Sequence, residues 1–208
     1  MTTIDQLIVG FDRGLRTVFG PASGHRPNPA ADLPEACLDE TQRRHAAGLM
    51  RINHTGEICA QALYEGQAMA AEQPSARAML LKAADEEADH LAWCGDRLRE
   101  LDSRPSVLNP LFYAASWCMG LLTGKLGDRV SLGFVEATEE RVGAHLTEHL
   151  ETLPESDLRS RAIVTRMRTE EAEHGATALR AGGASFPVPV RRFMWLLSRV
   201  MTASTYRI

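Results

Sequence analysis

The chain has 208 residues, of which 44% are hydrophobic and 24% charged, and its formal net charge is −4. This length suits one well-packed domain, so we expect residues 1–208 to fold as a single domain. The mildly acidic balance argues against a nucleic-acid-binding protein, which normally carries a basic face. The four cysteines are widely spaced and form no Cys-x-x-Cys pair, so we interpret them as reduced thiols of a cytosolic protein.

The first segment, residues 1–20, lacks the basic start, the apolar block and the cleavage site of a signal peptide. Its apolar residues fall on one helical face, with Arg13 and Arg16 nearby. They are Ile4, Leu7, Ile8, Phe11, Leu15, Val18 and Phe19. An amphipathic helix of this kind suits a membrane surface. A cap on the protein core or a dimer contact would use the same pattern.

Four long segments show the apolar periodicity of α-helices, and strand signals are almost absent. The first follows the N-cap residue Asp39 and runs to about Ala71, and the second runs from Ser75 to about Leu101. The third covers roughly residues 128–152, and the fourth begins near 156 or 157 and ends at the glycine pair 182–183. Short turns that contain proline join them in two pairs. We therefore predict an all-α protein built on an antiparallel four-helix bundle.

Between the second and third long helices lies an uncharged segment, residues 105–124. Its length approaches the ~20 residues that span a bilayer, but Asn109-Pro110 splits it, so we expect no true span. Near the C-terminus, apolar residues are interleaved with arginines; they are Phe193, Trp195, Leu196, Leu197, Val200 and Met201, with Arg191, Arg192, Arg199 and Arg207. Together with the N-terminal segment, these regions predict additional amphipathic helices that face a membrane.

A Glu-x-x-His motif occurs twice, as Glu87 with His90 and as Glu171 with His174. Three residues make about one helical turn, so the two side chains of each motif can reach the same ion. Both motifs lie on apolar stripes that we expect to face the core. An ionised glutamate there is costly unless it is compensated, and a metal ion would compensate it.

The other two long helices each carry a glutamate on their own apolar stripe. Glu57 lies 30 residues before Glu87, and Glu139 lies 32 residues before Glu171. Two hairpins that each supply one Glu and one Glu-x-x-His match the ligand set of ferritin-like di-iron or di-manganese bundles. Such oxygen and imidazole ligands suit iron or manganese better than a structural zinc site. The joint pattern predicts six metal ligands, which are Glu57, Glu87, His90, Glu139, Glu171 and His174.

A few neighbouring residues are weaker candidates. His54 could hydrogen-bond a ligand or belong to a partly exposed polar cluster. Tyr64 could be a redox-active phenol, but a packed core tyrosine is the simpler interpretation, and Cys94 is interpreted as a small core filler. We expect His149 at the surface, and the pattern does not decide the place of His145.

The string Arg51-Ile-Asn-His-Thr-Gly-Glu57, followed by the two Glu-x-x-His motifs, resembles the demethoxyubiquinone hydroxylase family of ubiquinone biosynthesis. The resemblance covers nearly the whole chain. It implies a di-iron monooxygenase that uses O2 to hydroxylate the ring of a polyprenylated methoxy-methyl-benzoquinol. It also implies two Fe ions per chain, one held by Glu57, Glu87 and His90 and the other by Glu139, Glu171 and His174. Glu87 and Glu171 would bridge the ions.

The same resemblance implies a peripheral membrane protein on the cytoplasmic face of the bacterial inner membrane, with other ubiquinone-biosynthesis proteins as candidate partners. The sequence indicates no flavin or dinucleotide fold, so electrons would come from an external reductant, with NADH as one candidate. Some relatives carry tyrosine where this chain has Leu146, so no role of that phenol is carried over. The alternative function is a ferritin-like iron-binding oxidase or storage protein without an organic substrate. Homo-oligomerisation is left open.

Overall fold

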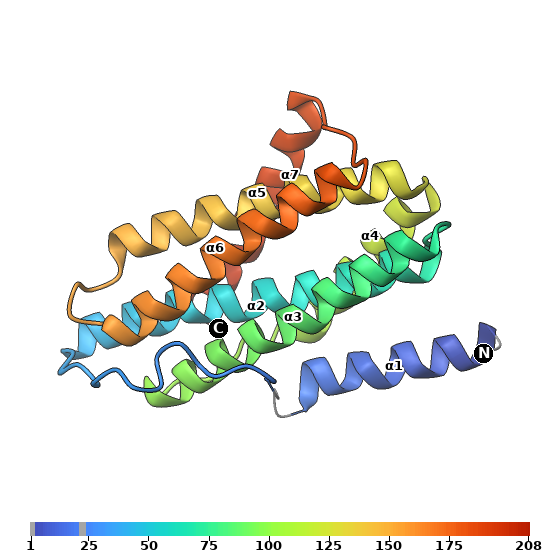
Figure 1. Cartoon of the computed structure of the whole chain (residues 1–208). Coiled ribbons are helices and arrows are strands. Elements are labelled where there is room, and N and C mark those ends of the chain that lie inside the picture. Colours follow the sequence, from blue (N-terminus) through green and yellow to red (C-terminus); the bar gives the residue numbers. More distant parts are fainter. Residues whose placement is uncertain (1–2, 21–23) are drawn as a thin grey trace.

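In the computed structural model of the chain, residues 3–20 and 24–208 are described, and everything regular among them is helical (Figure 1). The side chains of Ile4 and Leu7, two of the predicted apolar positions, lie outside the described residues. The helices are α1 (Thr3–Phe19), α2 (Glu40–Ala70), α3 (Pro74–Glu100), α4 (Asn109–Lys125), α5 (Asp128–Thr152), α6 (Leu158–Arg180) and α7 (Val188–Thr205).

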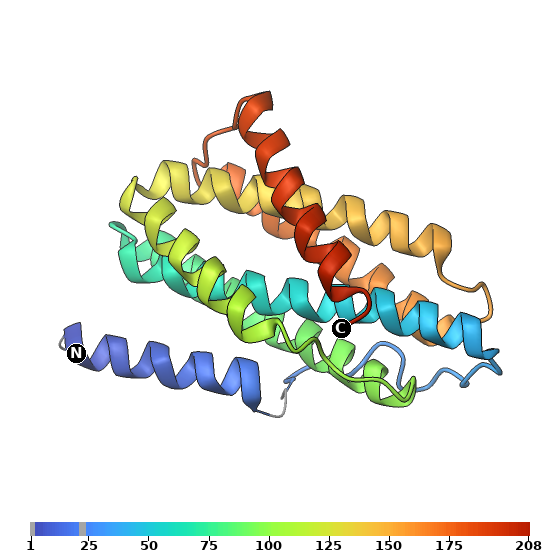
Figure 2. The same ribbon diagram turned by 180° about the vertical axis from the view of Figure 1, so that it is seen from behind.

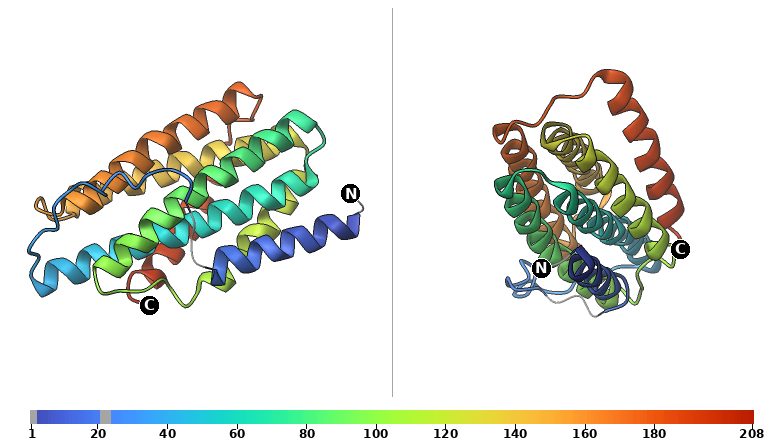
Figure 3. Two further views of the ribbon diagram at one scale, coloured as in Figure 1. Left: turned by 60° about the horizontal axis from the view of Figure 1, so that its bottom comes forward. Right: turned by 90° about the vertical axis from the view of Figure 1, so that its right-hand side faces the viewer.

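Helices α2, α3, α5 and α6 form the antiparallel four-helix bundle, as two hairpins packed side by side (Figures 1 and 3). The predicted boundaries of all four helices are confirmed to within two residues. Asp39 caps α2, because its carboxylate accepts the N–H of Gln42 at 2.8 Å while the Gln42 side chain accepts the N–H of Asp39 at 3.1 Å. Asp157 caps α6 by a single bond, in which its carboxylate accepts the N–H of Ser160 at 3.0 Å.

Helix α4 connects the two hairpins and lies against α2 and α5 (Figure 2). Pro110 stands in its first turn, where a missing N–H costs nothing, so the Asn109-Pro110 pair begins this helix rather than breaking one. The α2–α4 contact is close, since a Cβ added to Gly120 would overlap the Leu63 carbonyl oxygen. No helix in the described part of the chain is long and apolar enough to cross a membrane.

Helices α1 and α7 flank the bundle. The Thr17 hydroxyl of α1 donates to Gln61 Oε1 of α2 at 2.8 Å. Helix α7 crosses α5 and α2 on the side where α4 lies (Figure 2). It is tied there by Ser198, whose hydroxyl lies 2.6 Å from His145 Nε2, and at its end by Tyr206, whose hydroxyl lies 2.7 Å from His45 Nδ1.

The interior consists of two apolar clusters with a polar layer between them. One cluster includes Met50, Leu98 and Ile163, and the other includes Leu80 and Val135. The apolar stripe predicted on α3 is confirmed, because every one of its members is buried; they are Leu80, Ala84, Glu87, Leu91, Cys94 and Leu98. The buried polar layer is therefore held in place by packing on both sides.

Residues 24–39, which we call the N-terminal strap, run along the outside of α3 and α6 (Figure 3). The strap is fastened at one end by the fully buried Arg97 of α3. Its guanidinium donates to both carboxylate oxygens of Glu35 in the strap, at 2.6 and 3.0 Å, and to Asp157 at 2.9 Å. Near its other end, Arg26 reaches into the polar layer.

Candidate metal centre

The six residues predicted as metal ligands meet in the polar layer of the bundle. One group contains Glu57, Glu87, His90 and Glu171, and a second contains Glu87, Glu139, Glu171 and His174. Within each group, one ligand atom from every residue lies within 4.8 Å of the others. Glu87 and Glu171 belong to both groups. Helix α3 and helix α6 supply the Glu-x-x-His pairs, and α2 and α5 supply one glutamate each.

Both imidazole rings point Nδ1 at the centre of the cluster. His90 Nδ1 lies 2.8 Å from Glu87 Oε2 and 3.1 Å from Glu171 Oε1. His174 Nδ1 lies 3.0 Å from Glu87 Oε1 and 3.3 Å from Glu171 Oε2. Each shared glutamate therefore directs one oxygen to each imidazole, which is the geometry of a carboxylate that bridges two positions.

Charge is crowded in this cluster, because four carboxylates are buried together. Burial, together with the charges of Glu87 and Glu171, raises the pKa values of Glu57 and Glu139 well above the ordinary range. Burial opposes ionisation of Glu87 as well, but the charges and hydrogen bonds of the two histidines outweigh it and lower the pKa of Glu87. Burial likewise opposes protonation of His174, but its carboxylate neighbours raise its pKa to about 12. Without a cation, the cluster must hold protons to limit its negative charge.

A pair of divalent cations fits this donor set. Among the described residues, the buried Oε1 atoms of Glu87 and Glu171 accept no hydrogen bond, although each lies near an imidazole Nδ1, at 3.0 and 3.1 Å. A buried acceptor without a hydrogen bond is costly. Four carboxylates and two imidazoles are ligands that iron and manganese accept. Cations could replace the protons and contact the unpartnered oxygens at the same time.

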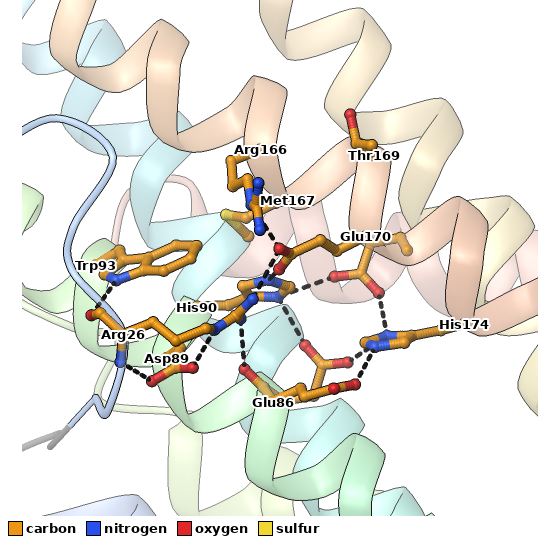
Figure 4. A network of polar contacts seen from close by, with 12 residues as sticks. Arg26, Glu86, Asp89, His90, Trp93, Arg166, Met167, Thr169, Glu170 and His174 are labelled. Carbon is orange, nitrogen blue, oxygen red and sulfur yellow. Dashed lines mark hydrogen bonds and ion pairs between the residues drawn. The ribbon is translucent and has the colours of Figure 1, made fainter.

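Two further carboxylates hold the outer nitrogens of the imidazoles, and the sequence analysis missed them. His90 Nε2 lies 2.6 Å from Glu170 Oε2, and His174 Nε2 lies 2.9 Å from Glu86 Oε2 (Figure 4). Each is the residue just before the shared glutamate of the opposite hairpin. The signal that could have found them is the doubled glutamate, Glu86-Glu87 and Glu170-Glu171. Such a partner fixes the ring so that Nδ1 faces the metal position as a free base.

The weaker candidates divide between the centre and the core. Tyr64 is fully buried, and its hydroxyl donates to Glu139, so it contacts the cluster directly. Cys94 packs in the apolar core, as predicted. His54 is buried, and its Nδ1 lies 3.5 Å from the Asn109 side chain of α4, so it ties α2 to α4 and is not part of a partly exposed cluster.

The expected surface position of His149 is wrong, because its side chain is only 6% exposed. Its ring stacks against that of His145 with 6.3 Å between the ring centres, and α2 and α7 close over the pair. His145 is half-buried. The residues that cover both histidines belong to helices distant in sequence, so the periodicity of α5 alone could not reveal this burial.

The fold and the cluster together define a ferritin-like helical bundle with a buried carboxylate–histidine centre. The family model described as "Ubiquinone biosynthesis protein COQ7" matches residues 44–205. The chain therefore belongs to the COQ7 family of ubiquinone biosynthesis proteins, in agreement with the resemblance seen in the sequence.

Similar proteins span the same length as this chain. A protein of Azotobacter vinelandii is 57% identical over 206 residues, which cover 98% of this chain and 95% of that protein. A protein of Chromohalobacter salexigens is 56% identical over 209 residues (100% and 98%), and one of Polynucleobacter asymbioticus is 55% identical over 209 residues (100% of both). Each of the three is named 3-demethoxyubiquinol 3-hydroxylase.

Proposed function

We propose that this protein is a di-iron monooxygenase that hydroxylates the ring of a demethoxyubiquinol with O2 in ubiquinone biosynthesis. The observation that carries the proposal is the six-residue cluster in a chain whose full-length relatives bear the name of that reaction. In the reaction, one oxygen atom of O2 enters a ring C–H bond, the other leaves as water, and two electrons and two protons are consumed.

We assign Glu57, Glu87 and His90 to one iron and Glu139, Glu171 and His174 to the other, with the shared glutamates as bridges. The donor types and the unpartnered carboxylate oxygens support this assignment. When bound, the two ions supply the electrons and the Lewis acidity with which O2 is activated. The four glutamates would hold the ions and balance their charge, because each carboxylate offers two oxygens.

The protein contributes positioning and exclusion of water. Glu170 and Glu86 hold the imidazole rings, and the Tyr64 hydroxyl holds Glu139. The apolar clusters above and below the centre exclude water from those two sides, which strengthens the electrostatic contacts within it. Tyr64 packs in the core, as the simpler interpretation of the sequence had it, and its hydrogen bond to Glu139 supports a positioning role; a redox role of its phenol stays a prediction.

We further propose that the protein attaches to the cytoplasmic face of the bacterial cell membrane, where a prenylated quinol resides. Exposed apolar side chains on the helices that flank the bundle support this proposal. They are Ile8, Phe11, Leu15 and Phe19 of α1, Leu111 and Leu122 of α4, and Phe193, Trp195, Leu196 and Val200 of α7. The two reducing electrons come from an external donor, for which NADH is one candidate, and other proteins of the same biosynthesis are candidate partners.

The quinone pool of a deletion strain tests the reaction. Cells that lack the protein should accumulate a quinone short of one methoxy group, and the wild-type gene should restore ubiquinone. Glu57→Ala and His174→Ala should not restore it, because each removes a ligand. Glu155→Ala, at an exposed position in the α5–α6 turn, should restore it fully.

Mass spectrometry of extracted quinones gives the readout, and immunoblots check that the variants are present in normal amounts. A normal quinone profile in the deletion strain, with no second hydroxylase in that organism, would exclude the proposed reaction. It would favour the ferritin-like iron oxidase instead.

A further inference from the structure

The two halves of the cluster are related by an internal repeat, and one feature breaks the symmetry. Residues 86–90 read Glu-Glu-Ala-Asp-His, and residues 170–174 read Glu-Glu-Ala-Glu-His. The fourth position of the repeat is Asp89 in α3 and Glu173 in α6. Asp89 is buried and contacts the N-terminal strap, whereas Glu173 is exposed. This carboxylate therefore ties the strap to the His90 half of the centre. The strap's contact with Glu86 of the other half is one long hydrogen bond, from Arg26 Nη2 to the backbone carbonyl oxygen of Glu86 at 3.5 Å, and not to its carboxylate.

Arg26 of the strap makes this contact (Figure 4). Asp89 Oδ1 accepts the backbone N–H of His25 at 2.5 Å and that of Arg26 at 3.1 Å, and Asp89 Oδ2 pairs with Arg26 Nε. The guanidinium then extends to Glu170 Oε1, which it meets through Nη1 at 2.7 Å. Because Glu170 Oε2 holds His90 Nε2, one continuous chain of contacts links the strap to an imidazole of the centre.

Packing fixes the guanidinium as firmly as its hydrogen bonds do. Its carbon lies 5.1 Å from the centre of the Trp93 ring, a cation–π contact. That ring in turn lies 5.3 Å from the His90 ring. Arg26 thus restrains His90 by two routes, through Glu170 and through Trp93.

The His174 half has weaker support. Its outer carboxylate, Glu86, pairs with Lys82, whose side chain is 76% exposed, whereas that of Arg26 is 34% exposed. His174 itself is 12% exposed, and His90 is fully buried. Arg166 also pairs with Glu170 at 2.5 Å, but it is 55% exposed and makes no link to Asp89 among the described contacts. A flexible ammonium on a mobile stem orients a carboxylate less firmly than a packed guanidinium does.

We propose that Arg26 is a positioning residue. Through it, the metal position at His90 binds its ion more tightly and releases it more slowly than the position at His174 does. The inference rests on the proposed metal assignment. Arg26 lies outside residues 44–205, which match the family model, whereas all six proposed ligands lie within them.

The test is the release of Fe²⁺ from anaerobically loaded protein into an excess of a colour-forming chelator. Wild-type protein should lose its iron in a fast and a slow phase of equal size. Loss of a group that orients a ligand typically costs ten- to a hundredfold in metal affinity, so Arg26→Gln should speed the slow phase by about tenfold. The fast phase should not change. His174→Ala should retain only the slow phase, which assigns that phase to His90.

Three more variants separate positioning from general stability. Asp89→Asn should reproduce the effect of Arg26→Gln, and the double variant should add nothing, because both substitutions break one chain of contacts. Arg26→Lys should give a slow phase whose rate lies between those of wild type and Arg26→Gln, because lysine keeps the charge but cannot span Asp89 and Glu170 together. Glu173→Gln, at the matching position of the other half, should leave both phases unchanged.

Acceleration of both phases alike would overturn the proposal, because Arg26 would then only stabilise the bundle. A single release phase in wild-type protein, or an unchanged slow phase in Arg26→Gln, would overturn it as well. If wild-type protein binds no iron at all, the failure lies in the proposed function itself.

Discussion

Glu171, like Glu87, occupies a central position in the cluster, because its two oxygens face both imidazoles. They lie 3.1 Å from His90 Nδ1 and 3.3 Å from His174 Nδ1. Wild-type protein made with adequate iron should contain about two Fe per chain, as ferritin-like di-iron bundles do. Glu171→Ala should contain less than one, since the change removes a ligand from both positions. Elemental analysis of the purified proteins measures this difference.

Glu173→Ala is the matched control for this prediction, because it removes an exposed glutamate two residues away on the same helix. It should keep the wild-type iron content. Thermal unfolding with and without added Fe²⁺ separates site loss from misfolding, since a folded but empty site loses only the stabilisation that the metal confers. Zinc in place of iron, or unchanged iron in Glu171→Ala, would contradict the assignment.

The sequence was sufficient to predict which six residues meet, because each lies on an apolar stripe where a charge needs a partner. It was not sufficient to predict the contacts that orient them. Glu86 and Glu170 lie at the edge of their stripes, where a glutamate normally faces solvent. Their role depends on the opposite hairpin, and the role of Arg26 depends on a strap with no periodicity to interpret.

His149 should make the stability of the protein sensitive to acid. Burial, assisted by the nearby His145 and His45, lowers the pKa of His149 to about 4. The unfolded chain, with an ordinary histidine pKa near 6.5, takes up a proton between these values while the folded chain does not. Stability from this residue is therefore complete above about pH 6.5 and is lost as pH falls. From pH 7 to pH 5 the loss should be about 2 kcal/mol.

Urea unfolding of chelator-treated protein at pH 7, 6 and 5 checks this prediction. His149→Leu should lose less stability than wild type over that range, by about the same 2 kcal/mol. His25→Leu, which removes an exposed histidine from the strap, should follow the wild-type curve. Equal pH dependence in wild type and His149→Leu would show that the buried imidazole is protonated without cost.

At the scale of elements, the helices could be located from periodicity and capping residues, because these are local signals. The path of α4 could not be predicted from such local signals. Its charge-free sequence favoured a membrane-facing helix over a cap on the bundle, and only the structure shows that it packs against α2 with backbone nearly touching backbone. Gly66 and Gly120 permit this approach, and in the sequence they are two of 16 glycines with nothing to distinguish them.

Replacing two glycines by alanine should therefore have opposite effects. Alanine favours a helix over glycine by about 1 kcal/mol. At Gly143 of α5 no described atom outside the helix lies within 4 Å of the added methyl group, so Gly143→Ala should stabilise the protein by up to about 1 kcal/mol. At Gly120 the methyl group meets the Leu63 carbonyl, and overpacking of this kind costs about 1–3 kcal/mol, so Gly120→Ala should destabilise.

Chemical denaturation of the two variants beside wild type gives the comparison. Equal stabilisation by both substitutions would mean that α4 can move away from α2 without loss.

At the scale of the whole molecule, the bundle has two different sides. The strap and the outer carboxylates lie on the α3–α6 side (Figure 4). Helices α4 and α7 cover the α2–α5 side (Figure 2). Exposed apolar residues such as Leu122, Phe193 and Leu196 belong to these covering helices, and Arg192 and Arg199 lie among those of α7. The side opposite the strap is therefore the one suited to lipid.

We predict reversible attachment to anionic vesicles through this side, without a span. Apolar burial and arginine contacts with headgroups both contribute, so high salt should weaken binding but not abolish it, because salt screens only the charges. Trp195→Asp combined with Leu196→Asp should release more protein than salt does.

Leu158→Asp places a charge on an exposed leucine of α6, on the other side, and should bind like wild type. Co-sedimentation with vesicles measures all four conditions. Equal release by the α6 substitution would show that added negative charge, rather than lost apolar contact, accounts for the effect. If wild-type protein does not bind the vesicles, the proposed membrane attachment is wrong.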